Sequence, residues 1–130
     1  MSAGSIEDLV KYRLERSKQT IKEADVLIEN KMWNAAVNRL YYACYYAVSS
    51  LLLRHGFQAK THAGTRQLFA LHFIDQGKVQ VSTGRFYSKL FSKRQTGDYD
   101  DLVDYTESDV RVLLEPAKAM VNEIEDLLSS

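Results

Sequence analysis

The polar residues best suited to chemistry lie together late in the chain, in the run KRQTGDY from Lys93 to Tyr99. Just before and within this run, Arg85, Lys89 and Lys93 are spaced four residues apart. On a helix such residues share a face, and a row of cations can hold a phosphate backbone by electrostatic attraction. The same spacing is typical of a solvated helix face with cations near its C-terminal end. The residues by themselves favour this second interpretation.

Clustered carboxylates raise the question of a metal site. Four aspartates follow one another closely, namely Asp98, Asp100, Asp101 and Asp104. Hard divalent cations prefer clustered oxygen ligands, but this spacing matches no calcium-binding loop, so an acidic, solubilising loop is the better interpretation. The three histidines, His55, His62 and His72, have no metal-ligand spacing, and the six glycines are isolated rather than gathered in a phosphate-binding loop. We expect neither a metal nor a cofactor.

The stretch Trp33–Leu53, WNAAVNRLYYACYYAVSSLLL, predicts the element that positions these residues. Apolar or tyrosine side chains cover nearly the whole helical circumference, and such a helix must be buried by its neighbours or by lipid. Arg39 and four tyrosines argue against lipid, because a spanning helix needs about 20 residues with few or no charges. We therefore expect a buried central helix, with Cys44 as an inert core thiol.

Four further amphipathic segments surround this helix in the sequence. A first helix is expected from Ser5 to the break at 30–32, and a third from a Thr61 cap to about Gly77. A fourth is expected from Ser82 or Thr83 to Gly97, and the last from a Thr106 cap to the end of the chain. The predicted fold is all-α, an up-and-down four-helix bundle with an additional short helix, and residues 1–130 form a single domain.

Composition limits the kinds of partner. The 130 residues include 17 Lys+Arg and 17 Asp+Glu, and this zero net charge gives no overall attraction to nucleic acid or to a membrane. Any site for a polyanion must therefore be local. The N-terminal segment lacks the apolar core of a signal peptide, so we expect a cytoplasmic protein with no membrane association.

Several motifs occur in a joint order along the chain: NRLYYACYYAVSSLLL at 38–53, Lys60-Thr61-His62, Leu90-Phe91, Arg94, and Asp98-Tyr99-Asp100. In this order and spacing they resemble the small prokaryotic HEPN-domain proteins over essentially the whole domain. The resemblance implies a bundle of four or five helices, usually a homodimer, and frequent pairing with a minimal nucleotidyltransferase in toxin–antitoxin-like modules. It also implies a candidate activity, since many HEPN proteins are metal-independent ribonucleases. Their motif is an arginine followed, after four to six residues, by a histidine.

The sequence departs from this ribonuclease motif. Arg94 stands at the position of the family's arginine, but residues 99–101 are Tyr-Asp-Asp and contain no histidine. Arg66 and His72 have the right spacing, yet six steps along a helix leave their side chains about 120° out of register, so we interpret this match as coincidence. Arg94 therefore carries over as a candidate and the catalytic histidine does not.

Metal-free RNA cleavage needs a general base, a general acid and a cation at the phosphate. Arg94 could supply the cation, and Asp98 or His62 could transfer protons if the fold brings them close. The alternative is that Arg94 and Asp98 simply form an ion pair, worth about 0–1 kcal/mol if exposed. Because the motif's histidine is missing, a binding role is favoured over catalysis.

Three hypotheses follow. The leading one is a nucleotide- or RNA-binding module that works with a minimal nucleotidyltransferase, with its site formed by Lys89, Lys93, Arg94, Asp98, Tyr99 and His62. The second is a metal-independent ribonuclease toxin with a non-histidine base, using Arg94 and Asp98 as catalytic residues. The third is a structural adaptor whose tyrosine-rich helix packs against a partner protein.

Overall fold

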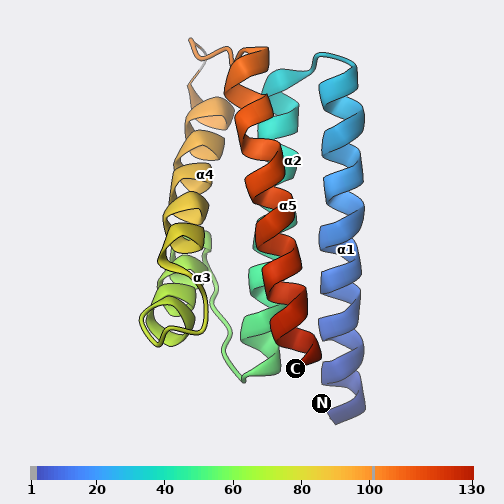
Figure 1. The fold of residues 1–130 in the computed structure, drawn as a ribbon, viewed down its shortest axis with the longest axis vertical. Helices are drawn as coiled ribbons and strands as arrows, with labels where there is room; N and C mark the ends of the chain where they lie inside the picture. The colour runs from blue at the N-terminus through green and yellow to red at the C-terminus, as the bar shows by residue number, and fades with distance from the viewer. Residues whose placement is uncertain (1–2, 101) are drawn as a thin grey trace.

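Four long helices form an antiparallel bundle in a computed structural model that describes residues 3–100 and 102–130 (Figure 1). These helices are α1 (Ala3–Glu29), α2 (Trp33–Arg54), α4 (Val81–Tyr99) and α5 (Glu107–Ser129). Between α2 and α4, the short helix α3 (His62–Phe69) continues into a π-helical segment, η1 (Ala70–Ile74). The described residues contain no strand. The predicted all-α bundle with one additional short helix is confirmed.

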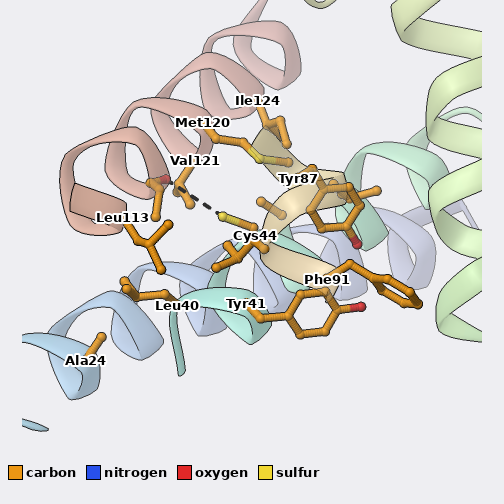
Figure 2. Packing of buried hydrophobic residues seen from close by; sticks show 14 of the residues in the cluster. Ala24, Leu40, Tyr41, Cys44, Tyr87, Phe91, Leu113, Met120, Val121 and Ile124 are labelled. Carbon is orange, nitrogen blue, oxygen red and sulfur yellow. Dashed lines mark hydrogen bonds between the residues drawn. The ribbon is translucent and has the colours of Figure 1, made fainter. Parts of the chain in front are cut away.

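Helix α2 lies at the centre of the core, as its apolar circumference predicts. It packs against α1, α4 and α5, and eleven of its residues are buried. Figure 2 shows Leu40 and Cys44 directed toward α5, while Tyr41 lies beside Tyr87 and Phe91 of α4. The Cys44 thiol is fully buried 3.9 Å from the Ala117 carbonyl oxygen, and burial raises its pKa, so it is held as an inert thiol. None of the described helices is long and apolar enough to cross a membrane.

Local capping signals set several helix ends as the sequence predicts. The Thr61 hydroxyl accepts a hydrogen bond from the Gly64 amide at 2.9 Å and caps α3. Thr106 and Asp109 form a reciprocal capping box at the start of α5. These side chains satisfy amide groups that have no partner within the helix, which explains why both ends are recognisable in the sequence.

Helix α4 ends later than predicted, at Tyr99 rather than Gly97. The glycine serves a close approach instead of a helix end, because a Cβ at position 97 would lie 2.9 Å from Cε2 of Tyr105. The Tyr105 hydroxyl reaches across this glycine and donates a hydrogen bond to the Lys93 carbonyl at 2.6 Å. Consequently Asp98 belongs to the last turn of α4, one turn after Arg94, and not to a loop.

Candidate functional site

Arg94 is held from two helices near the C-terminal end of α4. Its Nε atom lies 2.9 Å from Oδ2 of Asp98 in an ion pair, and its Nη2 donates a hydrogen bond to the Tyr42 hydroxyl at 3.0 Å. Asn38 of α2 donates from Nδ2 to the same carboxylate oxygen at 3.1 Å. Only 12% of the Arg94 side chain is exposed. The guanidinium is thus fixed by α2 as well as by its own helix.

Aromatic rings complete the surroundings of Arg94. Its Cζ atom lies 5.4 Å from the ring centroid of Tyr41, 5.3 Å from that of Tyr42 and 6.0 Å from that of Tyr99. These distances fall within the range in which a ring face attracts a cation. We call Asn38, Tyr41, Tyr42, Asp98 and Tyr99 the Arg94 cage. It combines one carboxylate with three rings around one cation.

The cage does not use all the donors of Arg94. A guanidinium carries five N–H groups, of which one meets Asp98 and one meets the Tyr42 hydroxyl. Three N–H groups remain, and the fork geometry of arginine suits the oxygens of a phosphate. A bound anion would share the guanidinium with the carboxylate of Asp98, which offsets part of its positive charge, so hydrogen bonds from the remaining N–H groups would have to supply most of the affinity.

His62 joins this cluster from the start of α3. Its ring stacks on Tyr45 with centroids 4.3 Å apart and meets Tyr42 edge-on at 5.6 Å. Its Nδ1 lies 2.6 Å from the Tyr41 hydroxyl oxygen. Burial, with a further contribution from Arg94, lowers the pKa of His62, so the neutral ring is favoured at neutral pH.

The Tyr41 hydroxyl occupies Nδ1 of His62 in either neutral tautomer of the ring. Burial raises the pKa of Tyr41 to about 12, so this phenol keeps its proton at neutral pH and can donate it in a hydrogen bond. A neutral His62 whose Nδ1 accepts this bond carries its own proton on Nε2. In this tautomer His62 offers an N–H donor at Nε2, whereas in the other tautomer Nδ1 donates to the Tyr41 hydroxyl and Nε2 is a basic nitrogen. His62 therefore suits ligand binding through Nε2–H in the first tautomer and proton abstraction through Nε2 in the second.

The remaining predicted site residues do not join the Arg94 cage. The Nζ atom of Lys93 lies 5.5 Å from the Tyr105 ring centroid, which places it on the α5 side of α4. Hydrogen bonds from Thr106 lower the pKa of Asp109, and the charge of Lys93 adds to this effect. Lys89, one turn before Lys93, is exposed. Both lysines remain predicted site residues, although their positions point to a different surface from that of Arg94.

The expected row of cations on α4 is not one surface. Lys93 follows Arg85 by eight positions, and on a helix eight steps rotate the two side chains about 80° apart. Arg85 lines a groove of about 350 Å³ with Arg66 and apolar residues of α3 and η1, whereas Lys93 faces Tyr105. A single phosphate backbone following α4 is therefore not favoured by the fold.

His72 packs as a half-buried residue of the third helical segment, as expected. Its ring stacks on Phe57 with centroids 3.9 Å apart, whereas the guanidinium of Arg66 lies over Phe91 at 4.5 Å. The two residues with ribonuclease-like spacing thus contact different rings.

The acidic stretch shows no metal-binding geometry where the structure describes it. Between residues 3 and 100 and from 102 onward, no group of three His, Cys, Asp or Glu side chains is placed to hold an ion. Asp100 instead accepts a hydrogen bond from the Leu102 amide at 3.0 Å in a local turn. Asp101 lies outside the described residues.

Sequence reasoning misses the contribution of α2 to this cluster. Asn38, Tyr42 and Tyr45 recur at helical spacing, which is a detectable signal for one shared face. The apolar pattern instead assigns the tyrosines to the bulk of the core and treats Asn38 as an interruption of it. In the structure Tyr41 is buried, while Tyr42, Tyr45 and Asn38 are only partly covered. These three residues bring polar atoms to the edge of the cluster.

The fold and the cluster together define a class: a small antiparallel helical bundle with an arginine on its third long helix held against a tyrosine-rich second helix. The HEPN domain family matches residues 10–127, and the chain belongs to this family. A UPF0332 protein of Thermotoga maritima is 36% identical over 122 residues, covering 94% of this chain and 92% of that protein.

Two archaeal relatives carry more specific names. The "Putative toxin MJ0605" of Methanocaldococcus jannaschii is 29% identical, covering 95% of this chain and 91% of that protein. The "Putative toxin MJ0142" of the same organism is 26% identical, covering 90% of this chain and 80% of that protein. The crystal structure of TT1696 from Thermus thermophilus superimposes with a TM-score of 0.77 at 18% identity, covering 90% of this chain and 96% of that one. At this identity the superposition supports the fold.

The electrostatic effect of Arg94 on the pKa of His62 gives a first prediction. Because the Arg94 charge helps to lower the pKa of His62, Arg94→Gln is expected to raise that pKa. Lys89→Gln, on another face of α4, is expected to leave it unchanged. An NMR titration of the histidine ring signals measures both variants. Equal His62 pKa values in wild type and Arg94→Gln would contradict the proximity described here.

Proposed function

We propose that this protein is a nucleotide- or RNA-binding HEPN module of a toxin–antitoxin-like pair, acting in the cytoplasm as a homodimer with a minimal nucleotidyltransferase partner. The observation that supports it best is the Arg94 cage: a fixed guanidinium with three N–H groups left for a phosphate. The names of the two archaeal relatives support the toxin-like setting. The partner and the homodimer rest on the family resemblance.

The surroundings of Arg94 match what a nucleotide offers. Tyr99, 77% exposed, presents an aromatic face on which a base can stack. In the tautomer in which Nδ1 accepts from Tyr41, the Nε2–H group of His62 is suited to donate to a phosphate or ribose oxygen. The cation, the ring and the neutral donor would bind a nucleotide without a metal ion. They would contact its phosphate, its ribose and the face of its base, which all four nucleotides have in common.

Binding without cleavage is the favoured form of this proposal. A ribonuclease would need a base for the 2′-hydroxyl, and because the Tyr41 hydroxyl occupies Nδ1, His62 supplies one only in the tautomer that leaves Nε2 unprotonated. Asp98 lies close enough to Arg94 to serve as that base, but its carboxylate is held by the ion pair with Arg94 and by a hydrogen bond from Asn38. The ribonuclease alternative therefore requires this network to rearrange on binding.

A direct assay separates the three hypotheses. The purified protein is incubated with a fluorescent single-stranded RNA of ten nucleotides, with and without EDTA, and binding and strand integrity are measured together. We expect saturable binding with the RNA intact. Cleavage that resists EDTA would establish the ribonuclease alternative instead. No binding of RNA or nucleotides, together with tight co-purification of another protein, would favour the adaptor and refute our proposal.

A further inference from the structure

A second arginine lies beside the Arg94 cage, on α1. Arg13 donates a hydrogen bond from Nη1 to the Ser49 hydroxyl at 2.8 Å. The two residues line a small pocket of about 70 Å³ together with Tyr45 and the connector residues 57–59. Arg13 is the sole charged residue among those that line it. The pocket thus presents one guanidinium in a polar recess next to the ring on which His62 stacks.

The register of α2 aligns this pocket with the Arg94 cage. Tyr42 contacts Arg94, and Ser49 contacts Arg13. These two α2 residues are seven apart, which is close to two full turns, so they face the same way about 10 Å apart along the axis. Helix α1 runs alongside α2 (Figure 1). The hydrogen bond to Ser49 places the Arg13 side chain at this face.

Rings and cations lie side by side along this part of α2. The guanidinium of Arg39 lies 5.1 Å from the Tyr42 ring centroid, and that of Arg16 lies 5.8 Å from that of Tyr46. The rings of Tyr42, Tyr45 and Tyr46 are partly exposed. His62 stacks on Tyr45 and guanidinium groups lie over the other two rings, so a base would meet the ring surface that these neighbours leave open. Proteins that bind single strands without sequence preference combine these same two elements.

The charge on this surface is locally positive although the chain is neutral. Arg13, Arg16, Arg39 and Arg94 are opposed by two carboxylates. Glu23 lies 3.4 Å from Arg16 and 3.6 Å from Arg39, and Asp98 pairs with Arg94. Because Arg13 stands over an otherwise uncharged pocket, its attraction for an anion is the least compensated of the four.

We propose that single-stranded RNA lies along this outer face of α2, with one phosphate at Arg94 and another at Arg13. The bases between them would contact Tyr42, Tyr45 and Tyr46. A nucleoside monophosphate has one phosphate group and occupies the Arg94 end, whereas a chain of a few nucleotides occupies both ends. This inference rests on the proposed RNA-binding function and names its ligand as a single strand rather than a free nucleotide.

The test compares a short and a long ligand. AMP and a ten-nucleotide single-stranded RNA are titrated against wild type, Arg13→Ala and Arg94→Ala by calorimetry or fluorescence anisotropy at several salt concentrations. Arg13→Ala is expected to weaken RNA binding about tenfold, to reduce the slope of log K against log salt by about 0.7, and to leave AMP binding unchanged. Arg94→Ala is expected to weaken the binding of both ligands.

Controls separate the outcomes that would count against each claim. Arg111→Ala removes an exposed arginine of α5 that pairs with Glu107, and should leave both affinities unchanged. Wild-type affinity for RNA in Arg13→Ala, with the loss confined to Arg94→Ala, would overturn this inference and keep the proposed function. A wild type that binds neither ligand would refute both. A change of oligomeric mass in Arg13→Ala would identify this face as a contact between copies of the chain and would also overturn the inference. The variant Arg13→Gln repeats the binding test with a longer, polar side chain in place of alanine.

Discussion

Arg94→Ala is expected to lower the affinity for single-stranded RNA at least about tenfold. Hydrogen bonds to a charged group contribute about 1.5–3 kcal/mol each, and about 1.4 kcal/mol corresponds to a factor of ten in the dissociation constant. The substitution removes the three N–H groups that the cage leaves free for a phosphate. Fluorescence anisotropy with a labelled ten-nucleotide RNA measures the change.

Two further variants make this result specific to the guanidinium. Arg94→Lys keeps the charge but loses the planar fork, so an intermediate affinity is expected. Arg111→Ala removes an equally charged side chain from an exposed ion pair on α5, and its RNA affinity should match wild type. Equal affinity of Arg94→Ala and wild type would exclude Arg94 from the site.

The Arg94→Ala protein should remain folded, which keeps the binding test meaningful. Asp98 loses its ion-pair partner, but 27% of its side chain is exposed and Asn38 still donates to it. Water can therefore replace part of the lost interaction, unlike at a fully buried charge. Thermal unfolding followed by circular dichroism provides the check.

Leu40→Ala is expected to have the largest effect on stability, a loss of about 2–5 kcal/mol in the free energy of unfolding. Leu40 is 0% exposed and lies in the core cluster between α2 and α5, where Leu113 is its neighbour in Figure 2. Truncation removes buried apolar surface and leaves a cavity that the packed helices fill only partly. Urea unfolding measures this change as a shift in the denaturation midpoint, with the dependence of the free energy on urea concentration unchanged.

The matched control is an apolar truncation on the surface. Val112→Ala, at a side chain that is 63% exposed on α5, should change the free energy of unfolding by no more than about 0.5 kcal/mol. A loss below about 1 kcal/mol in Leu40→Ala would contradict the central position assigned to α2, because truncation of a fully buried leucine lowers the free energy of unfolding by more than this amount. It would favour an arrangement in which another helix fills the core.

The sequence by itself determined the helical elements and the central position of α2. Both depend on local patterns: the apolar circumference of residues 33–53, and the caps at Thr61 and Thr106 that satisfy nearby amides. The predicted end of α4 at Gly97 was wrong for a non-local reason. The glycine accommodates the ring of Tyr105, eight residues later, and position 97 stays helical.

Only the tertiary structure decided which polar residues meet. Arg94 contacts Tyr42 across 52 positions of sequence, and Asp98 contacts Asn38 across 60. Helical periodicity fixes which side chains share a face of one helix, but not how that helix is rotated against its neighbours. This rotation turns Lys93 toward Tyr105 and places His62 on Tyr45. The candidate site is therefore set by helix packing, since its members come from three helices that no local pattern relates.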